Sequence, residues 1–170
     1  MKENIKKALE MIKNQPLLDI GRASNLLWLS IGEPITYIDR RGEKVEKGTY
    51  ALHVQASWRI ISYEKKMIKL ASSDMYMPKS SLEWTEEFNW DIQGNNLFDE
   101  KAREWFDKNA PLVLEECEWK ASGDLLIKFS NNDYLQVFVD CSAEEEMWRI
   151  FQCNTKEPHY VGYPFEINLE

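Results

Sequence analysis

The chain lacks any long apolar run. Its longest uninterrupted stretch is Leu26-Leu27-Trp28-Leu29, whereas a membrane-spanning helix needs about 20 apolar residues. The first 15 residues alternate charged and apolar side chains and so lack the continuous hydrophobic segment of a secretory signal. We therefore expect no membrane association, no export and a cytoplasmic location.

Cysteine, histidine and glycine are also scarce. The three cysteines are an odd number with no close pair, so neither a disulfide framework nor a zinc site is indicated, although Cys117, Cys141, Cys153 and His159 together remain a disfavoured zinc alternative. The 7 glycines are scattered singly, which excludes the common phosphate-binding loops and nucleophile elbows. We expect no metal and no cofactor, and any nucleophilic pair would have to use His53 or His159 as its base.

Basic residues are fewer than acidic residues. The chain has 21 Lys and Arg against 29 Asp and Glu, a net charge of -8, with no basic block. Nucleic acid is therefore not an expected partner, because phosphate backbones attract basic surfaces. The acidic excess favours either plain solubility or a basic protein partner.

What remains is the composition of an ordinary folded domain. The 170 residues are 44% hydrophobic and 29% charged, which fits one domain around one core. Apolar residues at helical spacing predict an N-terminal helix over residues 1–15, ended by Asn14 and Pro16. A second helix is predicted near residues 97–108, with its body at 98–109 and Asn96 as its N-cap.

The rest of the chain is predicted to be strands and one loop. Residues 26–76 form a first strand group, in which the alternation from Tyr50 to Ile60 predicts one long strand. Residues 77–97 have no stable period and are predicted to be a loop excursion. Residues 112–168 read as an antiparallel meander, in which Val113, Cys117 and Trp119 share one face. The fold class predicted is α+β, a single domain with a mainly antiparallel sheet.

One tripeptide occurs twice. Trp-Arg-Ile stands at residues 58–60 and 148–150, and each copy follows a Leu-x-Val at 52–54 or 135–137. The separations differ by seven residues and the helices do not match. We therefore favour coincidence or convergent packing over duplication, with each Trp packed inward and each Arg near a carboxylate.

One polar group is a candidate site. If residues 50–60 are one strand, His53, Gln55, Ser57 and Arg59 line one face about 6.6 Å apart. Arg59 would then bind an anionic group that Gln55 orients. The alternative is that these residues are the ordinary solvated face of an antiparallel sheet.

Two residues beyond the next strand extend this candidate. Asp74 and Tyr76 lie where the partner strand is expected to end. They would reach the polar face, where His53 and Asp74 would act as an acid–base pair and Tyr76 would help to bind a ligand.

Aromatic residues supply a second candidate. The chain has 7 Trp, 7 Tyr and 7 Phe, and Trp84 and Trp90 lie in the polar loop predicted at 77–97. Large rigid aromatic side chains anchor protein contacts at a low entropic cost, so these two are candidate interaction residues. The alternative is that they form a small satellite core beneath the loop.

Three segments carry a resemblance. Tyr50–Ile60 (YALHVQASWRI), Ser73–Pro78 (SDMYMP) and Glu146–Ile150 (EMWRI) resemble a widespread family of small uncharacterised bacterial proteins. Its relatives commonly have a cysteine where this chain has Ala56, so thiol chemistry does not carry over. The resemblance implies a bacterial, cytosolic, single-domain protein and no particular activity.

Together these observations favour a non-enzymatic protein-interaction factor, of an immunity type that occupies a toxin or effector. The alternative is a small-molecule or anion-binding protein, or a hydrolase, that uses the polar face around His53 and Arg59. The sequence favours the absence of enzymatic activity without deciding it.

Overall fold

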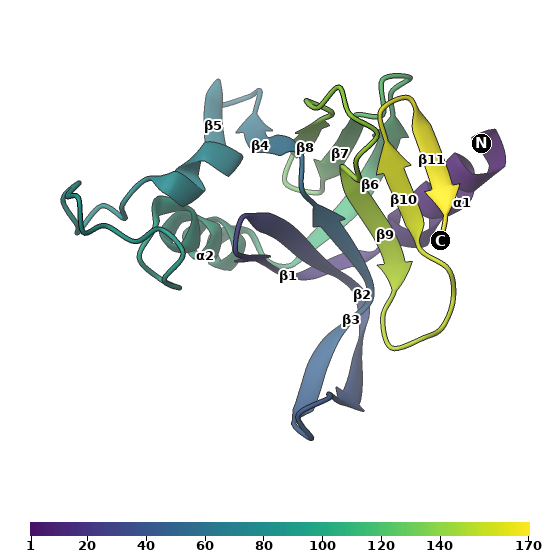
Figure 1. Cartoon of the computed structure of the whole chain (residues 1–170), viewed down its shortest axis with the longest axis horizontal. Helices are drawn as coiled ribbons and strands as arrows, with labels where there is room; N and C mark the ends of the chain where they lie inside the picture. Colours follow the sequence, from purple (N-terminus) through teal and green to yellow (C-terminus); the bar gives the residue numbers. More distant parts are fainter.

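The computed structural model describes residues 1–170 and confirms the α+β fold, with a large antiparallel sheet (Figure 1). In chain order its elements are α1 (Lys2–Ile12), β1 (Pro16–Ala23), β2 (Leu26–Ile38), β3 (Lys44–Val54), β4 (Ser57–Ser62), β5 (Met67–Ala71), the 3-10 helix η1 (Ser72–Tyr76), α2 (Leu97–Asn109), β6 (Leu112–Trp119), β7 (Leu125–Phe129), β8 (Asp133–Phe138), β9 (Trp148–Gln152), β10 (Tyr160–Tyr163) and β11 (Glu166–Leu169). Neither α-helix combines the length and the apolar character that crossing a membrane requires.

The sheet consists of two halves joined by a short seam. The strand order is β11-β10-β9-β3-β2-β1-β6-β7-β8-β4-β5, and β1 meets β6 through only two residue pairs. One buried cluster of 28 residues draws on both halves, for example Leu52 and Ile150 from the first half and Ile60 and Leu135 from the second. The halves therefore enclose a common core, and α1 contributes Ala8 and Ile12 to it.

The repeated Trp-Arg-Ile segments have a structural explanation. Trp58 on β4 pairs with Val137 of the second Leu-x-Val segment. Trp148 on β9 pairs with Val54 of the first. The chain passes from one half of the sheet to the other between β3 and β4 and again between β8 and β9, so the two copies pair crosswise at equivalent corners. Both indoles are buried. Trp148 packs where Gly162 has no side chain, because a Cβ there would lie 2.1 Å from the ring.

The prediction of one strand over residues 50–60 is wrong. The chain leaves β3 after Val54, and the backbone N–H groups of Gln55 and Ala56 both donate to the carbonyl of Met147, at 2.8 and 3.1 Å. The residues with even numbers nevertheless all face the core. Alternation continues through this corner because β3 and β4 cover the same core from two sides, so periodicity alone cannot reveal the break.

Other strand predictions need smaller corrections. Strands β1 and β11 were not predicted, and β2 continues through a register shift between Ile31 and Pro34. In β6 a register shift between Leu114 and Glu116 reverses which residues face inward. Cys117 and Trp119 therefore pack against the core, whereas Leu114 replaces Val113 there. Strand β9 pairs with β3 and β10 instead of extending the meander.

Two segments extend away from the core. Beyond Ile31 and Gly48, β2 and β3 continue as a two-stranded ribbon, which Figure 1 shows below the rest of the molecule; we call residues 33–47 the arm. Residues 77–96 contain no helix or strand, only an isolated bridge between Pro78 and Asn96, which confirms the predicted loop. We call this segment the loop, and it leads directly into α2, which begins after Asn96 as predicted.

Candidate functional site

The structure separates the residues of the predicted polar face. His53 lies on β3 and Arg59 on β4, which belong to different halves of the sheet. The Arg59 Nε donates to Gln136 Oε1 at 2.7 Å, and its guanidinium lies 5.1 Å from the centre of the Phe138 ring. Ser57 donates to a carboxylate oxygen of Asp140. Arg59 therefore lies among residues of β8 and shares no site with His53.

Asp74 and Tyr76 also have other partners. The Asp74 Oδ2 accepts a hydrogen bond of 2.9 Å from the backbone N–H of Ala71 and so closes the first turn of η1. The Tyr76 ring lies edge-on to Trp90, with 5.0 Å between the ring centres. Because η1 follows β5 at the far end of the sheet from β3, the structure does not bring Asp74 to His53 as an acid–base partner.

His53 instead belongs to a different cluster on β3 and β9. Its ring packs edge-on against the Phe151 ring, with 4.9 Å between the ring centres. The His159 ring stacks on the same Phe151 ring, with 4.4 Å between the centres. Arg149 lies opposite His53 and bonds to both carboxylate oxygens of Glu146, with its Nε 2.6 Å from Oε1. Both histidines of the chain thus meet at one ion pair.

The electrostatics of this cluster favour the neutral form of both histidines. Arg149 Nη1 lies 3.0 Å from His159 Nδ1, and because a guanidinium only donates, this Nδ1 must accept. Burial and then the Arg149 charge lower the pKa of both His53 and His159. The hydrogen bonds from Arg149 lower the pKa of Glu146, and a hydrogen bond from Gln55 lowers it further. No group of three or more His, Cys, Asp or Glu is arranged to hold a metal ion.

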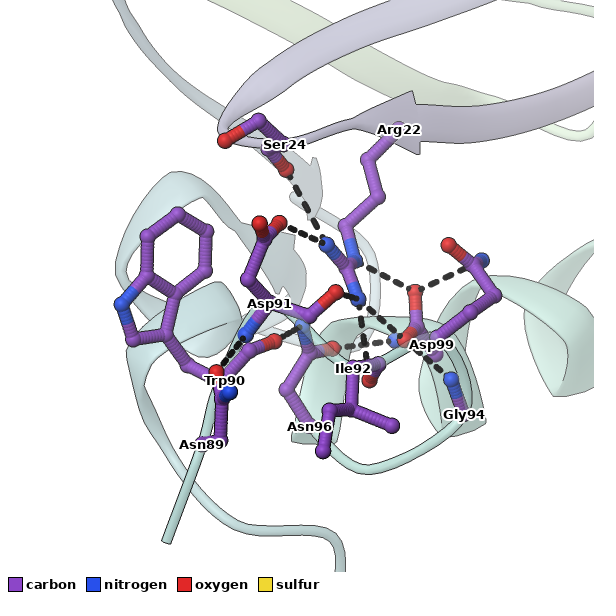
Figure 2. Close-up of polar contacts among 10 residues, drawn as sticks. Arg22, Ser24, Asn89, Trp90, Asp91, Ile92, Gly94, Asn96 and Asp99 are labelled. Atoms are coloured by element: carbon purple, nitrogen blue, oxygen red, sulfur yellow. Dashed lines mark hydrogen bonds and ion pairs between the residues drawn. The ribbon is translucent and has the colours of Figure 1, made fainter.

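A second cluster, which the sequence reading missed, holds the loop in place. Figure 2 shows Arg22, from β1, reaching into the loop and the first turn of α2. Its Nε and Nη2 bond to the two carboxylate oxygens of Asp99 at 2.8 and 2.9 Å, and its Nη1 lies 3.3 Å from Asp91 Oδ1. The remaining donor capacity goes to backbone carbonyls, those of Ser24, Asp91 and Ile92.

This cluster is almost closed to water. The side chains of Arg22 and Asp99 are 1% and 7% exposed, whereas Asp91 is 55% exposed. Asp99 also accepts from the N–H of Gly94 at 2.7 Å, and its own N–H donates to the Asn96 cap at 2.9 Å. The Asn96 amide in turn donates to the carbonyl of Trp90 at 2.9 Å. The C-terminal part of the loop, residues 90–96, is therefore held from inside by this network, in which the bonds to Asp99 and Asp91 are charge-assisted and so of the strong kind.

The outer side of the loop is apolar and acidic. Of the 12 large apolar side chains that are exposed in the chain, 5 lie in or next to the loop: Tyr76, Met77, Leu82, Trp84 and Ile92. Trp84 is 66% exposed and packs only loosely on Phe88, with 5.5 Å between ring centres. Trp90 is half-buried against Tyr76. Residues 77–96 carry four acidic side chains and one lysine.

The sequence around Arg22 gives no signal that its side chain is buried. Its neighbours include Asp19, Ser24 and Asn25, as is common for an exposed arginine. Its partners are about 70 residues away, so no local pattern identifies them.

No protein-family model, no curated protein and no solved structure matches the chain. The structure itself defines the class: an α+β protein with a large antiparallel sheet and an exposed aromatic loop fixed by a buried ion pair. Function is therefore argued from these features alone.

Proposed function

We propose that the protein is a non-enzymatic protein-binding factor, of an immunity type that occupies a toxin or effector, and that it binds its partner through the loop. The observation that carries this proposal is the combination of an exposed Trp84 with a buried Arg22–Asp99 pair that holds the C-terminal part of the same loop. Exposed aromatic residues on a fixed backbone lose little entropy on binding and are typical interaction anchors.

The charge of the loop specifies the kind of partner. Glu83, Glu86, Glu87 and Asp91 surround the exposed aromatic side chains in the sequence, and only Lys79 opposes them. A partner with an apolar pocket inside a basic surface would match both properties. Association should then be faster at low ionic strength, because charge steers the encounter.

The anion-binding or hydrolase alternative has less support. It required His53 and Arg59 on one face, and they lie in different halves of the sheet. The cation beside His53 is instead Arg149, and its guanidinium already forms an ion pair with Glu146. An incoming anion would have to displace that carboxylate.

A binding experiment with matched variants tests the proposal. The wild-type chain, a Trp84→Ala/Phe88→Ala variant and a Phe165→Ala control are immobilised and exposed to lysate of the native host. Phe165 is 69% exposed and lies outside the loop, between β10 and β11, so it controls for loss of exposed aromatic surface. The expected result is a stoichiometric basic protein that wild type and control retain and the loop variant loses.

Charge reversal separates loop recognition from general stickiness. Glu86→Lys/Glu87→Lys should weaken binding of the same purified partner at least tenfold, mainly through a lower association rate. A partner that both loop variants retain, or that only Phe165→Ala loses, would refute the proposal. So would the absence of any stoichiometric partner.

A further inference from the structure

A cleft on another part of the molecule has no role in the function proposed above. It has a volume of about 560 Å³. Its walls are β5 and the turn before it, one side of α2, and the turn between β7 and β8. That volume is in the range of small-molecule sites. Of its 13 lining residues only 3 are hydrophobic, namely Met67, Ile68 and Trp105, so a polar ligand fits it better than an apolar one.

Four lysines line this cleft, from two separate regions of the chain. Lys65 and Lys69 belong to the β4–β5 turn and to β5, and Lys101 and Lys108 lie seven residues apart on α2. Lys65, Lys69 and Lys101 have no carboxylate oxygen within ion-pair distance, and Lys108 has a long contact of 3.9 Å to Glu104. The lining also holds three carboxylates, Glu64, Glu104 and Asp133, so the cleft has a small positive excess in a chain with a net charge of -8.

Protection of the sheet edge explains only part of the cluster. Strand β5 ends the sheet, and lysines on edge strands prevent unwanted pairing. That role accounts for Lys65 and Lys69. It does not account for Lys101 and Lys108, which face the same cleft from a helix.

The carboxylates of the cleft leave these cations available. Asp133 is only 4% exposed, and its Oδ2 accepts from Trp105 Nε1 at 2.8 Å and from the Asn131 amide at 2.9 Å. These bonds fix the indole at the cleft and occupy one carboxylate oxygen of Asp133. Glu104 makes only the long contact to Lys108, and Glu64 makes no ion pair.

We propose that this cleft binds a small polyanion, a molecule with clustered phosphate or carboxylate groups. Lysines are flexible point charges that bind such groups without a fixed geometry, and cations on two facing walls can contact one ligand from both sides. Asn109 and Asn131 each use one amide N–H within the protein, on the Trp105 carbonyl and on Asp133, and the second N–H of each is a further donor at the cleft.

The test is a titration of the ¹⁵N-labelled full chain with pyrophosphate and, separately, with citrate at constant ionic strength. The Trp105 indole signal and the side-chain amide signals of Asn109 and Asn131 report on the cleft. We expect saturable shifts of these signals, with a Kd at or below about 1 mM. Lys69→Gln/Lys101→Gln should weaken binding about tenfold or more, while Lys44→Gln/Lys47→Gln, on the arm, should change it less than about twofold.

Each outcome has a definite meaning. Saturation by pyrophosphate alone supports a phosphoryl ligand, saturation by citrate alone supports a polycarboxylate, and saturation by both supports recognition of clustered charge. Absence of saturable shifts with both probes overturns the proposal. Equal weakening in the arm variant also overturns it, because binding would then follow total charge. Unchanged signals outside the cleft in the variants establish that they are folded.

Discussion

The loop and the arm are the two long excursions from the core, and they are held in opposite ways. The arm is regular, since its strands pair from Pro34 opposite Gly48 to Ile38 opposite Lys44, yet none of its side chains makes an ion pair and Ile38 is 65% exposed. The loop has almost no regular structure, yet Arg22 holds its C-terminal part, at Asp91 and Ile92, through a side chain that is 1% exposed.

This comparison shows that a segment with regular backbone hydrogen bonds need not be anchored to the core, and that a segment without them can be. An isolated two-stranded ribbon is marginally stable in water, whereas a buried guanidinium with satisfied donors rigidifies the irregular backbone to which it bonds. A segment that must present aromatic side chains to a partner gains from the second arrangement, because the binding surface exists before the partner arrives.

The largest expected effect comes from removing Arg22. Arg22→Ala leaves Asp99 buried without its cation and should lower the free energy of unfolding by about 3–5 kcal/mol. Urea unfolding followed by circular dichroism measures this loss. Arg103→Ala, which removes an exposed guanidinium 3.4 Å from Asp19, should cost less than about 1 kcal/mol. Equal losses in the two variants would contradict the account.

Removing the helix cap should have the next largest effect. Asn96 is fully buried, caps α2 through the N–H of Asp99 and donates to the carbonyl of Trp90. Asn96→Ala should cost about 1–2 kcal/mol, with accelerated exchange of the amides in the first turn of α2. An Asn96→Ala protein as stable as wild type would show that the loop is held from the Arg22 side alone.

A change of pH should destabilise the part of the sheet where β3 pairs with β9, without acting on Arg22. Burial and Arg149 hold the pKa values of His53 and His159 below their ordinary 6.5 in the folded state. The unfolded chain therefore binds more protons just below pH 6.5, and stability should fall as the pH is lowered from 7 to 5, by on the order of 1 kcal/mol. The lowered pKa of Glu146 adds its loss only below its ordinary 4.5.

Unfolding measured across this pH range checks the prediction through its slope. His53→Gln/His159→Gln should flatten the slope between pH 7 and 5, whatever its effect on stability at pH 7. A double variant with the slope of wild type would show that these histidines do not govern the dependence.

The smallest effect on stability should come from Trp84. Its side chain is 66% exposed and contacts Phe88 only through tilted rings, so Trp84→Ala should change the free energy of unfolding by less than about 0.5 kcal/mol. Thermal unfolding measures this change. A loss above 2 kcal/mol would mean that Trp84 belongs to a satellite core, which was the alternative reading of the sequence.

The sequence predicted what local patterns determine. Helical spacing and the Asn96 cap predicted α2, and the lack of a period predicted the loop. The alternation of apolar and polar residues also identified the side chains that face the core before and after Gln55 and Ala56. It failed to show that the strand ends there, and it predicted one strand where the structure has β3 and β4. Alternation reports only which side chains face the core. The same parity of residues faces the core before and after the chain passes from one half of the sheet to the other, so alternation does not detect that passage.

The candidate sites depended on contacts that no local pattern contains. The proposed partners of His53 were placed by assuming one strand, and the break at the corner gave it Arg149 and Glu146 in place of Arg59 and Asp74. Trp84 and Trp90 lie in the loop as predicted, and their role in recognition stays a prediction.

Hydrogen exchange tests the fixation of the loop most directly. The loop and cap amides of Lys79, Gly94 and Leu97 have defined acceptors in Asn95, Asp99 and Met77. In the wild-type chain they should exchange more slowly than the paired amides of the arm. In Arg22→Ala this order should reverse, with the arm unchanged. Loop amides that already exchange faster than those of the arm in wild type, or that keep their protection without Arg22, would contradict the account.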